Sequence, residues 1–331
     1  MTVEQVQPAG RGEAAPIGVT AVVLTHLRPR LAGDVTRALL SSERLTPGQV
    51  VVVVNGEGGL DDPALEARVR MVRLRRNTGP AGGFRAGLVE AFEDPATRWA
   101  YLCEDDVGLL ALPAPRLGDL VALVDGLPPD HPPVGAVVAY GRRFVGRGAH
   151  TENVVPAPGS DIGLSPVDVA CWGATLVSRA VVDAGVLPDP DLFFGLEDFD
   201  FFCQVRQAGF AVLVDTVAAR SVARSQTGPG RDEVLRDERP NDVDEAWRAY
   251  YHSRNSVTLA RRYGRPSWHA WHLAYSVRQL QKAHGRAHRS AIVHGLWDGA
   301  LGRTGRNDRY VRRVGEFAGS PEHGVGPAPA P

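Results

Sequence analysis

The amino-acid sequence predicts an α/β fold with a mainly parallel central sheet, flanking helices and a helical C-terminal region. Short continuous apolar runs, typical of strands buried on both faces, occur at 17–26, 49–56, 67–74 and 99–106. Segments with helical spacing lie between them, as expected for an alternating α/β unit. Polar residues follow each run, so we expect them to share one edge of the sheet.

The helical segments follow from residue spacing. After the first run, Val35 and Leu39 lie on one face of a predicted helix. After the third run, Phe84, Leu88 and Phe92 do the same in GGFRAGLVEAF. The sequence therefore predicts one helix between the first two strands and another between the third and fourth.

Domain limits follow from shifts in composition. We expect a disordered N-terminus at 1–16, an α/β domain at 17–245, a helical region at 246–305 and a mostly disordered tail at 306–331. Within the α/β domain, the polar stretch 222–245 lacks periodicity and is predicted to be a mobile loop. Further helices are expected at 267–284 and 288–300.

Composition narrows the function classes. The net charge of −1 gives no overall basic excess, so nucleic acid is not expected as a partner. Cys103, Cys171 and Cys203 are widely spaced and indicate reduced thiols rather than a disulfide framework. No apolar stretch reaches the roughly 18 residues of a membrane span, and the N-terminus has no signal core. The sequence predicts a cytoplasmic protein.

The glycine-rich stretch 75–88, RRNTGPAGGFRAGL, follows the third predicted strand. The earlier NGEGGL segment fails the GxGxxG fingerprint because Asp61 stands where the third glycine should be. P-loop spacing from Gly82 to Gly87 also fails, because Leu88 follows instead of lysine. A helix N-terminus with Arg85 nearby suits a phosphate group. A simple strand-to-helix turn is an equally good interpretation.

Two acidic stretches are candidates for chemistry. Glu104, Asp105 and Asp106 follow the fourth strand, where their mutual repulsion would be relieved by Mg²⁺ or Mn²⁺ and substrate phosphates. A solvated loop is the alternative. Glu197 and Asp198 lie among phenylalanines, where low polarity raises a carboxylate pKa towards that of a useful general base. They also suit a helix N-terminus, and we expect both roles to hold.

The ordered set of motifs resembles a known family. Its pieces are VVLTHLRP, VVVVNG, NTGPAGGFRAGL, the acidic triplet, WGATLVSR, GLEDFDFFCQVRQAGF and YYHSRNSVTL. Over about residues 18 to 305 the chain resembles inverting GT-A glycosyltransferases of the large nucleotide-sugar family. It is most similar to the galactofuranosyl- and rhamnosyltransferases of actinobacterial envelope and natural-product pathways.

The resemblance implies a role for each matching position. The catalytic base is Asp198, with Glu197 beside it, and the metal motif supplies Asp106 as direct ligand with Glu104. Trp172 and Gly173 match an acceptor-side wall. The nucleotide-sugar positions are Thr25, Arg28, Asn55, Asn77, Gly79, Gly82, Gly83, Arg85 and Asp105.

The chain departs from the family at one expected metal ligand. The family often has a histidine after the last core strand, and here the region contains Arg220 and Arg224 instead. The divalent cation, Mn²⁺ or Mg²⁺, is therefore an open expectation, since arginines could neutralise a diphosphate directly. The Trp268-His269 and Trp271-His272 pairs predict an amphipathic surface facing a lipid-linked acceptor or a partner subunit.

The expected reaction moves a sugar from a UDP- or dTDP-sugar to an acceptor hydroxyl with inversion. The acceptor could be a glycan, a lipid-linked molecule or a small molecule, and peripheral contact with the inner membrane face and a homo-oligomer stay open. A nucleotidyltransferase acting on a sugar phosphate is the first alternative, although THLRPRLAGD is a poor match to its basic loop. A non-catalytic sugar-nucleotide-binding protein is the second, and Asp198 argues against it.

Overall fold

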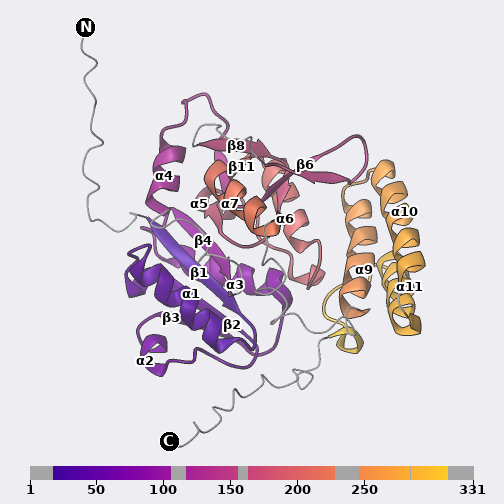
Figure 1. Cartoon of the computed structure of the whole chain (residues 1–331), viewed down its shortest axis with the longest axis horizontal. Coiled ribbons are helices and arrows are strands. Elements are labelled where there is room, and N and C mark those ends of the chain that lie inside the picture. The colour runs from indigo at the N-terminus through magenta and orange to yellow at the C-terminus, as the bar shows by residue number, and fades with distance from the viewer. Residues whose placement is uncertain (1–17, 106–116, 156–162, 228–245, 284, 312–331) are drawn as a thin grey trace, which may run out of the picture. The chain divides into compact units, whose positions relative to one another are not determined.

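The computed structural model describes residues 18–105, 117–155, 163–227, 246–283 and 285–311. The chain divides into two compact units, Met1–Gln226 and Thr227–Pro331, which are described separately (Figure 1). In the described part of both units, the helices are too short or too polar to span a lipid bilayer.

The first unit is built on an eight-stranded sheet with the order β3-β2-β1-β4-β10-β5-β11-β8. Strands β3, β2, β1 and β4 are parallel, as are β5 and β11, whereas β10 and β8 run antiparallel to their neighbours. The strands are β1 (Val19–Thr25), β2 (Val50–Asn55), β3 (Arg70–Leu74), β4 (Trp99–Glu104), β5 (Val134–Val138), β8 (Leu164–Val167), β10 (Thr175–Ser178) and β11 (Ala211–Asp215). The predicted α/β class with a mainly parallel central sheet is confirmed.

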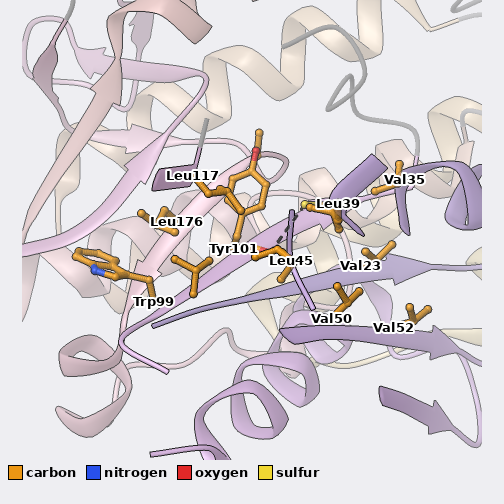
Figure 2. Packing of buried hydrophobic residues seen from close by; sticks show 14 of the residues in the cluster. Val23, Val35, Leu39, Leu45, Val50, Val52, Trp99, Tyr101, Leu117 and Leu176 are labelled. Carbon is orange, nitrogen blue, oxygen red and sulfur yellow. Dashed lines mark hydrogen bonds between the residues drawn. The ribbon is translucent and has the colours of Figure 1, made fainter. Parts of the chain in front are cut away.

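Every residue of β1 and β2 is buried, because helices cover both faces of this sheet. Val23 and Val52 pack with Val35 and Leu39 of α1 on one face (Figure 2). On the other face α3 approaches so closely that Gly87 leaves no room for a side chain beside Val22. The helices and 3₁₀ turns among the described residues of this unit are α1 (Pro29–Ser41), η1 (Pro47–Gln49), α2 (Pro63–Glu66), α3 (Gly79–Glu93), α4 (Leu117–Asp125), α5 (Arg179–Asp183), η3 (Pro190–Leu192), α6 (Glu197–Gln207) and α7 (Thr216–Thr227).

A second, three-stranded sheet has the order β7-β6-β9. Its strands are β6 (Gly141–Phe144), β7 (Thr151–Asn153) and β9 (Val169–Ala170). Arg142 of β6 pairs with Val169 of β9, immediately before the chain turns into β10. This small sheet was not predicted, because its strands are too short to show a hydrophobic period.

The described part of the second unit consists of the helices α9 (Ala246–Arg262), α10 (Pro266–Lys282) and α11 (Gly285–Ala300) and the turn η5 (Asp308–Tyr310). Its centre is the buried Arg254, whose guanidinium lies over the Tyr251 ring and donates to Asn255 and to the Gly305 carbonyl. Tyr250 donates to Asp298 at 2.7 Å and stacks on Tyr310 of η5. The ordered chain therefore continues past residue 305, where the sequence predicted a tail.

Two further expectations need correction. The predicted loop 222–245 begins too early, because α7 continues through Thr227, and the rest of that loop lies outside the described residues. Alanines and arginines, both strong helix formers, explain the longer helix. The predicted surface of Trp268, His269, Trp271 and His272 is wrong for Trp268 and His272, which are buried, whereas His269 is exposed and Trp271 partly so. Burial lowers the pKa of His272 to about 4.

Candidate active site

The first part of the site lies where β1 and β4 end. Leu24 pairs with Glu104 in this parallel register, so the next residues, Thr25 and Asp105, come side by side. The Thr25 hydroxyl donates to Asp105 Oδ2 at 2.7 Å, and Arg28 pairs with Asp105 Oδ1 at 2.5 Å. Asp105 is buried, whereas 30% of the Arg28 side chain is exposed. Asp105 therefore holds Thr25 and presents the Arg28 guanidinium at the rim.

The second part is the turn between β3 and α3. Asn55, at the end of β2, accepts from the Thr78 amide at 2.8 Å and from the Thr78 hydroxyl at 3.0 Å. Its own amide donates to the Gly79 carbonyl at 2.9 Å. Asn77 accepts from the Gly79 amide at 2.8 Å. The structure therefore uses both asparagines, predicted to contact the nucleotide-sugar, to shape this turn.

The glycines of this turn are required by close packing. Gly79 has φ +74°, and a Cβ there would lie 1.7 Å from the Phe193 carbonyl oxygen. Side chains at Gly82 and Gly83 would meet Thr78 and Leu24 at 2.4 and 2.3 Å. These contacts bring the η3–α6 segment against α3. Gly82 and Gly83 thus have packing roles where the sequence led us to expect ligand contacts.

Arg85 lies one turn further along α3. It is exposed and its guanidinium lies 3.4 Å from the Pro188 carbonyl. With Thr78, Gly82 and Pro190 it lines an open pocket of about 390 Å³. A cationic side chain at such a pocket suits an anionic group, as predicted for this position.

The third part is the start of α6. Leu196 adopts the left-handed conformation at φ +66°, and Glu197 and Asp198 form the first turn, where the helix dipole favours negative charge. Trp172, which the β10–β4 register places beside the end of β4, packs inward against Phe84, Phe201 and Phe202 at centroid distances of 5.0, 5.3 and 5.9 Å. The Trp172 side chain is therefore largely buried, rather than forming an open wall.

Glu197 is the more perturbed of the two carboxylates. Burial raises its pKa well above the ordinary value, and the charges of Asp198 and Glu104 raise it further. The Trp172 indole acts in the opposite direction. Nevertheless, neither Glu197 Oε2 nor Trp172 Nε1 reaches hydrogen-bond geometry with an atom of the described residues. A buried carboxylate so weakly compensated takes up a proton readily.

Asp198 is half-buried and better compensated. Burial raises its pKa, while the Phe199 backbone amide, which donates to Oδ1 at 2.7 Å, lowers it. Cys171 and Arg142 also act to lower the pKa. Asp198 thus combines raised basicity with partial access to solvent, two properties that a general base needs.

Two residues of this cluster were not identified from the sequence. Arg142 comes from β6 and reaches the cluster through its pairing with β9, and its Nη2 also donates to the Thr151 carbonyl at 3.0 Å. Cys171 follows β9, and both burial and the Asp198 charge raise its pKa. Four described residues other than glycine with positive φ flank these segments, and backbone strain of this kind is common at functional sites. They are Leu27, Ala174, Phe193 and Leu196. Gly173, predicted on the acceptor side, has φ +97° in the same turn as Ala174.

The described part of the chain holds no cluster of three or more metal-ligating His, Cys, Asp or Glu side chains. Of the predicted metal residues, Glu104 ends β4, and Asp106 lies outside the described residues. Asp105 is engaged with Thr25 and Arg28. The charge of Glu104 raises the pKa of Glu197, so these two acidic side chains lie near each other at this edge. Hard carboxylate oxygens in an electronegative site are of the type that Mn²⁺ or Mg²⁺ binds.

Comparison with known proteins shows a similarity of sequence to a glycosyltransferase. The chain is 36% identical to the galactofuranosyltransferase GlfT1 of Mycobacterium tuberculosis over 94 residues, 27% of this chain and 30% of that protein. The chain thus matches less than a third of that relative's length. No family model matches. The predicted resemblance to galactofuranosyltransferases is confirmed as a similarity of sequence over this segment.

Solved structures with a similar arrangement include two bound to nucleotides or sugars. The mannosyltransferase PcManGT of Pyrobaculum calidifontis, in complex with GDP-Man and Mn²⁺, has a TM-score of 0.39 and 14% identity, covering 87% of each chain. GalNAc-T7 with UDP, GalNAc and Mn²⁺ has a TM-score of 0.41 and 14% identity, covering 61% of this chain and 42% of that one. At these scores the likeness assigns no function.

Proposed function

We propose that the protein is an inverting GT-A glycosyltransferase that moves a sugar from a UDP- or dTDP-sugar to an acceptor hydroxyl. The observation on which the proposal depends is the pair Glu197–Asp198, two carboxylates of raised pKa at the start of α6. The similarity to GlfT1 supports the same reaction class. The acceptor is expected to be a glycan, a lipid-linked molecule or a small molecule.

Asp198 is the proposed base. One-step inversion requires a carboxylate that removes the proton of the acceptor hydroxyl as its oxygen bonds to the anomeric carbon and the bond to the nucleoside diphosphate breaks. Asp198 is half-buried, and the Phe199 amide fixes the direction of its carboxylate. Glu197 is buried and its pKa is raised further than that of Asp198, so Asp198 is the member of the pair that ionises more readily.

The leaving nucleoside diphosphate requires positive charge. Arg28, held at the rim by Asp105, and Arg85, at the pocket beside α3, are the proposed protein partners of the donor. Glu104 and Asp106 would hold a divalent cation, which neutralises charge on the departing diphosphate. Thr25 acts by fixing Asp105, and Asn55, Asn77 and Gly79 act by shaping the turn before α3.

Ligand-induced thermal stabilisation tests this proposal. We expect UDP or dTDP to raise the Tm more than GDP or CTP does, and Mn²⁺ to increase the shift. Arg28→Gln should reduce the shift, whereas Arg30→Gln, an exposed neighbour, should leave it unchanged. A response to CTP alone would favour the nucleotidyltransferase alternative. Strong binding of UDP-sugar without any turnover would favour a non-catalytic binding protein.

A further inference from the structure

Charge is distributed very unevenly along the chain. Residues 246–297 contain nine arginines and lysines and no aspartate or glutamate, although the whole chain has a net charge of −1. The rest of the chain therefore has a net charge of −10. Strong charge asymmetry between parts of one chain indicates an interaction with an anionic surface or polymer. The asymmetric stretch spans α9, α10 and most of α11.

The same helices expose large apolar side chains. Val293 and Trp297 of α11 are 51% and 63% exposed, and Leu301, directly after the helix ends, is 51% exposed; their spacing of four residues places them on one side. On α10, Leu273 and Val277 are 62% and 46% exposed with the same spacing. We call these five residues the apolar face. It contains most of the large hydrophobic side chains that are exposed among the described residues.

This apolar face is separate from the core of its own unit. The opposite side of α10 buries Trp268, His272 and Ser276, and the opposite side of α11 buries Ile292 and Gly295. At Gly295 a Cβ would lie 2.3 Å from the Tyr250 carbonyl oxygen of α9, so this side of α11 is tightly packed. Both helices thus have a packed side and an unpacked apolar side.

Basic side chains flank the connection between α10 and α11. Arg278, Lys282, Arg286 and Arg289 are all exposed. None of the four forms an ion pair with a residue in the described part of the chain, and the next acidic residue, Asp298, is paired with Arg303. Arg286 and Arg289 precede Val293 and Trp297 at helical spacing, so basic and apolar residues continue along one side of α11.

We propose that this apolar face and its basic residues dock the protein on the surface of an anionic lipid bilayer. A tryptophan with aliphatic neighbours inserts its ring at the headgroup level, while lysine and arginine contact anionic headgroups. An apolar face on one side of each helix, flanked by basic residues, is the pattern of helices that lie in the plane of the interface. The proposal concerns the second unit and goes beyond the proposed glycosyl transfer.

Vesicle flotation of the full chain tests this docking directly. We expect binding to vesicles of phosphatidylcholine with phosphatidylglycerol and not to phosphatidylcholine alone. Each basic residue near an anionic surface contributes about fivefold to partitioning, so the triple variant Arg278→Gln, Arg286→Gln, Arg289→Gln should bind about 100-fold more weakly. Trp297→Ser should weaken binding roughly tenfold through lost apolar burial.

Matched controls separate a local surface from overall charge and fold. The triple variant Arg68→Gln, Arg75→Gln, Arg76→Gln changes exposed residues of the first unit by the same charge and should bind as wild type does. Val145 directly follows β6 and is also exposed, so Val145→Ser is the control for Trp297→Ser and should bind vesicles as wild type does. Failure to bind anionic vesicles, or equal weakening by both triple variants, would overturn the proposal. A dimer in sedimentation that Trp297→Ser abolishes, without vesicle binding, would assign the face to self-association instead.

Discussion

Two acidic segments of the first unit have different electrostatic settings. Asp105, after β4, is buried with both oxygens engaged by Thr25 and Arg28. Glu197, at the start of α6, is equally buried, but no described residue forms an ion pair with it as Arg28 does with Asp105, and burial raises its pKa well above the ordinary value. The first carboxylate is neutralised by a cation, whereas the second is favoured in its protonated form.

This difference in electrostatic setting indicates a positioning role for Asp105 and a chemical role for the Glu197–Asp198 pair. A carboxylate paired with arginine is a poor proton acceptor, because the cation favours its charged form. A carboxylate with a raised pKa accepts a proton near neutral pH. Asp105 therefore suits the placement of Arg28, and the Glu197–Asp198 pair suits proton transfer. Each of the following changes should affect one segment without the other.

The largest effect is expected for Asp198→Asn. Loss of a general base reduces the rate of transfer about 10²–10⁴-fold. The rate of transfer is measured as nucleoside diphosphate released from UDP-galactofuranose or dTDP-rhamnose in the presence of glycan acceptors. Thermal shift should show unchanged binding of the donor nucleotide. Asp183→Asn, on the exposed end of α5, should transfer normally. Near-normal turnover by Asp198→Asn would remove this residue from the mechanism.

Asp105→Asn should lower the free energy of unfolding, and it should slow the transfer reaction much less than Asp198→Asn does. The change breaks the ion pair with Arg28 and disturbs the buried hydrogen bond to Thr25, at a cost of about 1–3 kcal/mol in the free energy of unfolding. Urea denaturation measures this cost. Asp34→Asn removes a similar ion pair, with Arg37, in which both side chains are more than 40% exposed, and should cost less than about 1 kcal/mol. Equal losses in the free energy of unfolding would show that the buried Asp105 contacts stabilise the fold no more than an exposed ion pair does.

Glu197→Gln should stabilise the protein increasingly as the pH rises. A raised folded-state pKa means that the wild-type carboxyl stabilises the fold fully below about pH 4.5, its ordinary pKa. That contribution decreases above this pH and is lost once the pH passes the raised value. The difference in Tm between Glu197→Gln and wild type should therefore be small in acid and grow with pH, by about 2–4 °C for each kcal/mol. A difference that grows towards acid would have the wrong sign.

The smallest effect is expected at Cys171. The Asp198 charge is one of the causes that raise the pKa of this thiol, after burial. Asp198→Asn should therefore lower the Cys171 pKa and speed its alkylation by iodoacetamide several-fold, since the thiolate is the nucleophile. Mass spectrometry of the Cys171 peptide measures the rate. Cys103 is the internal control, because its pKa is raised by burial and by Glu43 instead. Equal acceleration at both thiols would indicate general loosening.

Much of the fold was predictable from the sequence. Continuous runs such as VVVVV at 50–54 have one structural solution, a strand buried on both faces, and they form the centre of the sheet. The C-terminal helices begin and end within a few residues of the predicted limits. The antiparallel β10 was not predicted, because its direction depends on its distant partners Leu102 and Val138. Likewise, the burial of Trp268 depends on packing that helical spacing alone does not specify.

The sequence was sufficient to identify most residues of the candidate site, but not the contacts that they make. The acidic stretches and the glycine turn were identified from the sequence, and the structure brings Glu104 near Glu197. The inward direction of Asp105 was not apparent, since an acidic triplet gives no sign of which member faces an arginine. Arg142 was missed because it reaches Asp198 through a short sheet with partners far along the chain.

Carboxyl ¹³C NMR titration of Glu197 and Asp198 tests the central contrast most directly. Glu197→Gln and Asp198→Asn assign the two signals. Burial should raise both pKa values above their ordinary ones, and Glu197, with the weaker hydrogen bonding, should take up the first proton as the pH falls. If both groups instead titrate below their ordinary range, the pair is ionised and compensated like a structural ion pair, and its assignment to proton transfer is contradicted.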